Sequence, residues 1–489
     1  MEVIKVTNFI DGGFQTPIAN SQENQVLYID SVNPATGAIY AQIPNSTHLD
    51  VEEAVQAASR AFEGWANTPR TVRSQFLMKI ADAIEQRLTQ FAVSESHDQG
   101  KPVALAASVD IPRAIHNFRF FATSILHNSD MARELDQQEA LSYVHKSPTG
   151  VAALISPWNL PLYLLTWKIA PCIASGCTCV CKPSEFTSVT AFMLCQVLRD
   201  VGLPAGVVNI VFGTGEMVGA PLVAHPSVPL VSFTGGTATG ELIYKAAATG
   251  NKKLSLELGG KNANIVFEDA DLQEAIATSI RSSFANQGEI CLCGSRIFVQ
   301  ETIYQQFVDG LCERASKLCV GNPEAATTDL GALVSLQHLR KVQSYIEVAK
   351  SEGASVLLGG QRPTIPGFEN GFFFQPTIIV GVHPTASRLQ KEEIFGPVVT
   401  ITPFKTEDEA VRFANSTEYG LSASIWTQNV KRAHRVAQRL HVGTCWVNCW
   451  MVRDLNMPFG GVKKSGLGRE GRSHSMEFFC EEKTICLKL

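Results

Sequence analysis

The chain has 489 residues, a formal net charge of −5, 45% hydrophobic residues and 18% charged residues. This length exceeds one ordinary hydrophobic core, so we expect a globular protein built from two or three compact units. The sequence has neither the basic excess nor the basic stripe of nucleic-acid-binding proteins, and we therefore expect no nucleic acid partner.

The N-terminal segment MEVIKVTNFIDGGF shows no targeting signal. It lacks a basic stretch followed by an apolar run, and it is not rich in arginine and serine. The longest apolar stretch, residues 150–174, is interrupted by prolines and by Lys168. Because a bilayer span needs about 20 apolar residues, we expect no membrane contact. These features predict a cytoplasmic protein.

Thirteen cysteines are spread along the chain. An odd count without a secretory signal argues against a disulfide framework. Cys177, Cys179 and Cys181 alternate, which places them on one face of a strand as small buried side chains. No histidine pair or second CxxC accompanies them, so we expect no metal site.

The predicted elements fall into two series. Residues 50–67 and 74–93 carry helical periodicity. Beyond them, short apolar segments alternate with helix-like segments, which is typical of a doubly wound, Rossmann-like parallel sheet. These apolar segments are 151–156, 177–183, 207–213 and 230–235. A second series predicts another α/β domain, with strands at 262–267, 295–300 and 423–428.

The C-terminal segment TICLKL alternates like a strand. Together with residues 126–146 it could form a ribbon at the edge of the molecule. Because an open strand edge invites pairing, we predict that a partner chain covers it.

Two glycine-rich turns are candidate phosphate cradles. Gly213-Thr214-Gly215 is followed by Gly219, one residue late for a GxGxxG fingerprint, and residues 234–240 read TGGTATG. Glycines before a helix let the backbone approach a pyrophosphate. Each segment alone is better explained as a structural turn. The absence of a Gly-Lys-Ser/Thr ending disfavours nucleotide hydrolysis.

Lys182 and Glu185 follow a predicted strand, at the edge where parallel sheets bind ligands. Glu185 could accept hydrogen bonds from the two hydroxyls of an adenosine ribose. A 2′-phosphate would meet this carboxylate, so the segment favours NAD over NADP. The alternative is an exposed turn capped by Ser184.

Three further residues are candidates for covalent chemistry. Cys291 could be a nucleophile or a packed thiol. Glu257 lies on an apolar strand, where a carboxylate serves as a general base or forms an ion pair. Asn159 is flanked by prolines, and its amide could bind an oxyanion or close the turn.

These segments occur together and in order. ISPWNLPLYLLTWKIAP, KPSE, FTGG, LELGGKN, FANQGEIC, EEIFGPV and PFGGVKKSGLGREG resemble the aldehyde dehydrogenase superfamily over essentially the whole chain. The resemblance implies an NAD-binding domain (1–125 and 147–259), an α/β catalytic domain (260–455) and an oligomerisation ribbon (126–146 and 475–489). It also implies a homodimer or homotetramer.

The resemblance implies a catalytic set. Cys291 attacks the aldehyde, Asn159 and the backbone N–H of Cys291 hold the oxyanion, and Glu257 activates the water that hydrolyses the thioester. The implied NAD-binding residues are Ser156, Trp158, Lys182, Glu185, Gly215, Gly236, Leu258, Gly259, Glu393 and Phe395. Gly236 departs from the Ser of many relatives, which puts one phosphate hydrogen bond in doubt.

The substrate is expected to be an aldehyde that carries a carboxylate. Arg453, and in second place Arg119, are the expected partners of that carboxylate because guanidinium groups pair with it in a bidentate manner. For each the alternative is a structural ion pair, with Asp454 as one possible partner of Arg453. The expected apolar tunnel comprises Leu160, Leu164, Trp167, Ile290, Leu292, Val452 and Phe459.

Within the superfamily, NFRFFA and WMVRDLNMPFGG resemble the branch that oxidises 2-aminomuconic and 2-hydroxymuconic semialdehydes, which includes enzymes of tryptophan breakdown by the kynurenine route. The alternatives are a retinal or broad-specificity aldehyde dehydrogenase and a non-catalytic relative. The presence of Cys291, Glu257 and Asn159 argues against the latter. A retained base at Glu257 argues against phosphorylating or acyl-CoA-dependent chemistry.

Overall fold

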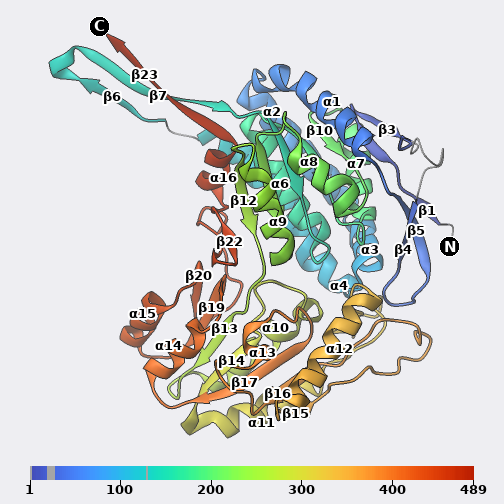
Figure 1. The fold of residues 1–489 in the computed structure, drawn as a ribbon, viewed down its shortest axis with the longest axis vertical. Helices are drawn as coiled ribbons and strands as arrows, with labels where there is room; N and C mark the ends of the chain where they lie inside the picture. Colours follow the sequence, from blue (N-terminus) through green and yellow to red (C-terminus); the bar gives the residue numbers. More distant parts are fainter. Residues whose placement is uncertain (1–2, 19–27, 128–129, 489) are drawn as a thin grey trace.

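The computed structural model describes residues 3–18, 28–127 and 130–488. Figure 1 shows two α/β units, one above the other, and a long ribbon that projects from the upper unit. No helix in the described part of the chain has the length and apolar composition that a bilayer span requires.

The upper unit is built on an eight-stranded sheet. Its order is β22 (Gly466–Leu467), β12 (Lys253–Glu257), β11 (Leu230–Thr234), β8 (Val151–Ile155), β9 (Thr178–Lys182), β10 (Val208–Ile210), β2 (Asn8–Ile10) and β3 (Gly13–Gln15). The five strands from β12 to β10 run parallel. Because the chain order reverses between β8 and β11, a crevice opens at their carboxyl ends, which is where such sheets bind ligands.

Helices cover both faces of this sheet. Alternate residues of β8 enter opposite cores: Ala152 and Leu154 pack in one, and Ala153 and Ile155 pack in the other. The helices are α1 (His48–Ala66), α2 (Arg70–Gln86), α3 (Leu88–Gln99), α5 (Ile111–Ser124), α6 (Pro161–Ser175), α7 (Val189–Asp200), α8 (Ala220–Ala224) and α9 (Thr237–Ala248). A continuous apolar run in β8 is therefore explained by burial on both faces.

One predicted helix is two. The sequence predicted a single helix over 74–93, but α2 ends at Gln86 and α3 begins at Leu88. Arg87 between them has φ −111° and ψ 18°, outside the helical region. The break leaves the apolar periodicity intact, so the sequence pattern alone does not reveal it.

The lower unit holds a seven-stranded sheet. Its order is β15 (Ser355–Leu358), β16 (Thr377–Val380), β17 (Val398–Phe404), β14 (Arg296–Gln300), β13 (Ala263–Val266), β19 (Ser422–Trp426) and β20 (Thr444–Val447). The strands run parallel except for β15. Its helices include α10 (Leu272–Phe284), α11 (Tyr304–Ala315), α12 (Leu336–Ser351), α14 (Glu407–Asn415) and α15 (Val430–Arg439).

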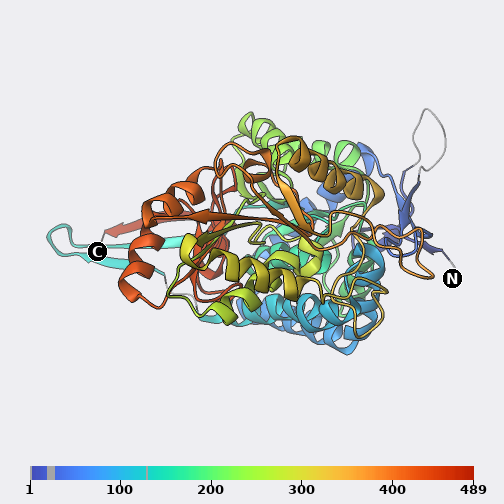
Figure 2. The same ribbon diagram turned by 90° about the horizontal axis from the view of Figure 1, so that it is seen from below.

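Two smaller sheets complete the fold. β1 (Ile4–Lys5), β5 (Ile39–Pro44) and β4 (Tyr28–Val32) form one. The projecting ribbon consists of β6 (Ala132–Leu135), β7 (Ala140–Pro148) and β23 (Cys480–Lys488), in the order β23-β7-β6. Figures 1 and 2 both show it extending beyond the rest of the molecule. The C-terminal segment therefore pairs with residues 140–148, as the sequence predicted.

Candidate active site

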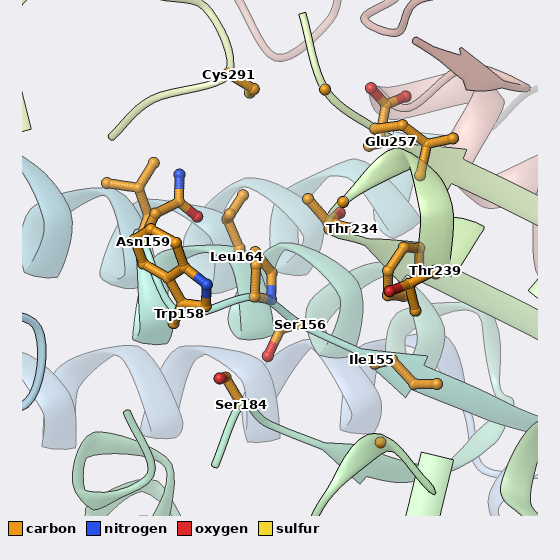
Figure 3. A pocket seen from close by; sticks show the side chains of 18 of the residues that line it. Ile155, Ser156, Trp158, Asn159, Leu164, Ser184, Thr234, Thr239, Glu257 and Cys291 are labelled. Atoms are coloured by element: carbon orange, nitrogen blue, oxygen red, sulfur yellow. The ribbon is translucent and has the colours of Figure 1, made fainter. Parts of the chain in front are cut away.

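A cavity of about 840 Å³ lies at the crevice of the upper sheet and is closed by segments of the lower unit. The carboxyl ends of β8, β11 and β12 form one wall, and residues 290–292, Glu393 and Phe395 form another. The three predicted catalytic residues and all ten predicted cofactor residues line it. Figure 3 shows Cys291, Asn159 and Glu257 around one open space, although they come from three separate segments.

Cys291 follows a turn with unusual backbone geometry. Asn286, Gln287 and Gly288 all have positive φ, at 52°, 55° and 74°. At Gly288 a Cβ atom would lie 2.2 Å from the carbonyl oxygen of Gly396, so only glycine fits. Such conformations persist only where the surroundings hold them, and they are frequent at active sites. The turn presents the half-buried Cys291 to the cavity.

Burial raises the pKa of the Cys291 thiol, and the carboxyl groups of Glu393 and Glu257 raise it further. The guanidinium of Arg453 acts in the opposite direction. The thiol is therefore protonated at neutral pH, and its attack on a carbonyl carbon needs a base that accepts the proton.

Asn159 lies in the turn between β8 and α6. Its Nδ2 donates to the carbonyl oxygen of Glu289, 2.9 Å away, which uses one amide hydrogen. In Figure 3 the amide nitrogen points toward Cys291. The second hydrogen is thus available to an oxygen atom bound next to the sulfur, which is the geometry of an oxyanion donor.

Glu257 ends strand β12. Within the described chain, neither oxygen of its buried carboxyl group has a hydrogen-bond partner. Burial raises the pKa of Glu257, and Glu470 raises it further. A Cβ atom at Gly460 would lie 2.7 Å from Glu257 Oε1, so a larger residue at position 460 would crowd the carboxyl group. A buried, unpaired carboxyl group with a raised pKa suits a general base.

Sequence reasoning missed the neighbours of Glu257. The indole Nε1–H of Trp167 and the ammonium group of Lys168 both donate to Glu470, the latter over 3.3 Å. Lys168 also donates to Ser232 Oγ over 2.9 Å. Lys168 in the apolar helix α6 could have indicated a buried acidic partner, because a buried lysine requires one.

The far end of the cavity fits an adenosine and a pyrophosphate. Lys182 Nζ lies 3.1 Å from Glu185 Oε2 at the end of β9. Gly236 caps the N-terminus of α9, where free N–H groups bind anions. A Cβ atom at Gly215 or Gly236 would meet no atom within 4 Å, so the space above both turns is open.

The other end of this groove approaches Cys291. Glu393 accepts a hydrogen bond of 2.8 Å from the backbone N–H of Gly260, which fixes its carboxylate at the cavity wall. A Cβ atom at Gly259 would lie 2.3 Å from Glu393 Oε2, so glycine is required there. The rings of Trp158 and Phe395 meet edge to face with centroids 5.3 Å apart. This wall suits a flat aromatic ring between Glu393 and the sulfur.

The aldehyde side of the cavity is mostly apolar, and its polar side chains are Arg113, Arg453, Tyr163 and Glu470. Arg453 Nη1 donates to the Tyr163 hydroxyl over 3.2 Å, and its Nε is buried without a partner in the described chain. Leu160, Leu164, Trp167, Ile290, Leu292 and Phe459 line the cavity as predicted. Val452 does not, because its side chain turns outward and is 69% exposed.

The sequence also matches known proteins. The model of the aldehyde dehydrogenase family covers residues 20–485. The chain belongs to this family. It is 52% identical over 489 residues to 2-aminomuconic semialdehyde dehydrogenase of Bos taurus, with 99% of each chain covered. It is 45% identical to 2-hydroxymuconic semialdehyde dehydrogenase of Pseudomonas sp. (strain CF600), covering 99% of this chain and all of that protein.

A solved structure has the same fold. Betaine aldehyde dehydrogenase of Staphylococcus aureus in complex with NAD+ superposes with a TM-score of 0.94, at 36% identity. The match covers 99% of this aldehyde dehydrogenase and 95% of that chain. The doubly wound sheet, the second α/β unit and the ribbon are therefore the aldehyde dehydrogenase fold, as the sequence predicted.

The structure corrects the assignment of Arg119 in this aldehyde dehydrogenase. Its side chain is 36% exposed and pairs with Glu85 at 2.6 Å and Asp82 at 2.9 Å, away from the cavity. Arg113, six residues earlier on α5, lines the cavity instead. Its guanidinium lies 5.5 Å from the ring centroid of Tyr163, the residue that Arg453 contacts.

Proposed function

We propose that this aldehyde dehydrogenase oxidises a muconic semialdehyde, 2-aminomuconic 6-semialdehyde or 2-hydroxymuconic semialdehyde, to the corresponding acid with NAD. The observation that carries the proposal is Arg453. Among the described residues its guanidinium has no carboxylate within 4.0 Å, although it lies in the cavity that holds Cys291. Relatives with names of this substrate class, 52% and 45% identical, support the proposal.

In the proposed reaction the Cys291 sulfur forms a bond to the aldehyde carbon, and Glu257 accepts the thiol proton. Asn159 Nδ2 and the backbone N–H of Cys291 donate to the resulting oxyanion. Bound NAD would supply the hydride acceptor for this carbon, and loss of the hydride would leave a thioester on Cys291. Glu257 releases the thiol proton to solvent and, as a carboxylate again, takes a proton from the water whose oxygen attacks the thioester carbon, and the sulfur leaves as a thiolate.

NAD is favoured over NADP because of Glu185. Its carboxylate lies next to Lys182 at the adenosine end, where it suits two ribose hydroxyls and repels a 2′-phosphate. The NAD+ complex of the Staphylococcus aureus relative supports this choice. The proposed cofactor residues are Ser156, Trp158, Lys182, Glu185, Gly215, Gly236, Leu258, Gly259, Glu393 and Phe395.

The substrate carboxylate would bind between Arg453 and Arg113. Both arginines contact Tyr163, so two cations approach one point of the apolar wall. A carboxylate there would pair with the guanidinium of Arg453, which has no carboxylate partner within hydrogen-bond distance among the described residues. Bidentate pairing in a partly desolvated site favours an acid over a neutral chain end.

The assembly and compartment are also proposals. We assign residues 1–125 and 147–259 to the NAD-binding domain, 260–455 to the catalytic domain, and 126–146 with 475–489 to the oligomerisation ribbon. The outer edge of β23 is open to a partner strand, which supports a homodimer or homotetramer. All thirteen cysteines are free thiols, which supports a reducing, cytoplasmic setting.

The test compares NADH formation from 2-hydroxymuconic semialdehyde, retinal and hexanal. We expect kcat/KM for the semialdehyde to exceed that for hexanal by at least about 30-fold, since a desolvated charge pair contributes about 2 kcal/mol or more. The apolar lining of Leu160, Leu164 and Phe459 would also admit retinal. A preference for retinal would replace the proposed substrate, and equal rates would indicate a broad-specificity enzyme.

A further inference from the structure

Three buried residues at the C-terminal end of α3, just before α4 (Val103–Leu105), contact both halves of the active site. We call Gln99, Gly100 and Lys101 the Gln99–Lys101 segment. Its two side chains are fully buried, and Gly100 has φ 94° with its backbone against Ala332, where a Cβ atom would lie 2.3 Å from the carbonyl oxygen. The segment therefore has a fixed conformation next to the cavity.

Lys101 contacts the half that carries Asn159. Its Nζ donates to the main-chain carbonyl oxygen of Asn159 over 3.0 Å and forms an ion pair with Asp110. Glu95 Oε1 lies 3.7 Å from the same nitrogen. Burial raises the pKa of Glu95 to about 8, so the carboxyl group of Glu95 beside Lys101 is largely protonated at neutral pH.

Gln99 contacts the half that carries Cys291. Its Nε2 donates to the carboxyl group of Glu289, two residues before Cys291. Its Oε1 accepts from the backbone N–H of Lys101 over 3.1 Å. Glu289 also accepts a hydrogen bond of 3.2 Å from the backbone N–H of Val334. The Gln99–Lys101 segment therefore holds both the strained turn before Cys291 and the backbone of Asn159.

The two halves meet at the carbonyl oxygen of Glu289. Asn159 Nδ2 donates to this oxygen over 2.9 Å, and Asn286 Nδ2 donates to it and to the Asn159 carbonyl oxygen, each over 3.2 Å. A shift of the Asn159 backbone would change the direction of its amide. Displacements of about 1 Å in such constellations cost about 100-fold in rate.

We propose that Lys101 is a positioning residue, which fixes the oxyanion-binding amide of Asn159 relative to Cys291 by holding the main-chain carbonyl group of Asn159. The inference rests on the proposed function, because it takes Asn159 as the oxyanion donor. Lys101 itself touches no reacting atom. Its effect on the reaction must therefore pass through Asn159.

The test is a double-mutant cycle of wild type, Lys101→Met, Asn159→Ala and the double variant, read as the pre-steady-state rate of NADH formation from 2-hydroxymuconic semialdehyde. Asn159→Ala should slow this step about 100- to 1,000-fold. Lys101→Met should slow it about tenfold in wild type and less than about twofold when Asn159 is already Ala. The Kd for NAD should stay unchanged in all four proteins.

A purely structural role predicts a different result. Lys101→Met would then slow both backgrounds by the same factor, or lower only the burst amplitude through loss of folded enzyme, and either result overturns the inference. If Asn159→Ala leaves the rate unchanged, Asn159 is not the oxyanion donor and the proposed function is contradicted at that point. If Asn159→Ala slows the reaction and Lys101→Met does not, the result contradicts the positioning role of Lys101 and leaves the role of Asn159 intact.

Two further variants guard against misfolding. Asp110→Asn keeps the size of the side chain and weakens the hold on Lys101, so we expect a smaller slowing that again vanishes in the Asn159→Ala background. Glu95→Gln is the matched control, because Glu95 belongs to the same buried cluster without contact to Asn159. Its rate should stay within about twofold of wild type; a slowing by Glu95→Gln equal to that of Lys101→Met would contradict the role of Lys101.

Discussion

The guanidinium carbon of Arg453 lies 3.7 Å from the centre of the Phe459 ring. The ring centre of Trp167 lies 5.2 Å from the same guanidinium carbon. Contact with aromatic faces holds a cation in place and removes part of its hydration. The charge therefore remains available to an anion inside the cavity, and the aldehyde side of this enzyme should select for an acid.

Replacing Arg453 should change specificity more than activity. For Arg453→Ala we expect kcat/KM for the semialdehyde to fall, because a desolvated charge pair is lost. The fall should correspond to a loss of about 2–5 kcal/mol of transition-state stabilisation. With hexanal, which carries no charge, the change should stay within about threefold. Arg113→Met should likewise lower kcat/KM for the semialdehyde and leave kcat/KM for hexanal nearly unchanged.

Arg119→Met is the matched control on the helix of Arg113. Arg119 forms surface ion pairs with Asp82 and Glu85, which contribute little to stability and nothing to the cavity. We expect wild-type kinetics with both aldehydes. Unchanged semialdehyde turnover in Arg453→Ala would refute the carboxylate site, whatever Arg119→Met does.

Glu185 should control the choice between the two dinucleotides. Glu185→Gln removes the charge that would face a 2′-phosphate and leaves Lys182 as an unpaired cation. We expect the ratio of kcat/KM for NADP to that for NAD to rise at least about tenfold, which corresponds to about 1.4 kcal/mol. A ratio that does not move would mean that the adenosine ribose binds elsewhere.

The pH dependence of thioester hydrolysis should follow Glu257. A base acts as the carboxylate, so hydrolysis slows as the pH falls through the pKa of Glu257, which burial and Glu470 raise. Glu470→Gln removes one of these causes and should move the acidic limb of the single-turnover deacylation profile to lower pH. The limb should disappear in Glu257→Gln. A shift to higher pH in Glu470→Gln would contradict this assignment.

His338 should destabilise the protein in acid. Its ring nitrogen bonds to the carbonyl oxygen of Phe395 at 2.6 Å, and burial lowers its pKa to about 4. The unfolded chain takes up this proton near pH 6.5 and the folded chain only near pH 4, so stability falls as the pH drops between these values. The loss approaches about 3 kcal/mol.

His338→Gln carries no titrating ring, and its amide still reaches a carbonyl oxygen. Thermal unfolding of the two proteins from pH 7 to pH 4 measures the difference. We expect the melting temperature of wild type to fall more steeply than that of the variant over this range. Parallel curves would show that His338 does not contribute.

The sequence singled out the three candidate catalytic residues because their motifs are local. Cys291, Glu257 and Asn159 each lie in a short distinctive segment, and the cavity brings the three together. The neighbours of Glu257 were not predictable in the same way. Glu470 meets Lys168 across 302 positions, and only the fold brings such residues into contact.

The arginines of α5 show a second limit. Arg113 and Arg119 are six residues apart, which places them about 240° apart around a helix. Only one of them can face the cavity, and the sequence does not reveal which face of α5 points inward. The motif NFRFFA directed attention to Arg119, whose charge is satisfied by Asp82 and Glu85.

Trapping an acyl group on Cys291 tests the covalent mechanism most directly. Acid quenching during turnover of the semialdehyde, followed by mass spectrometry, should find wild-type enzyme carrying the acyl group at Cys291. Cys291→Ser, which keeps the cavity and replaces a strong nucleophile by a weak one, should show no adduct and form NADH at least about 1,000-fold more slowly. NADH formation at the wild-type rate in Cys291→Ser, without an adduct in either protein, would contradict the covalent mechanism.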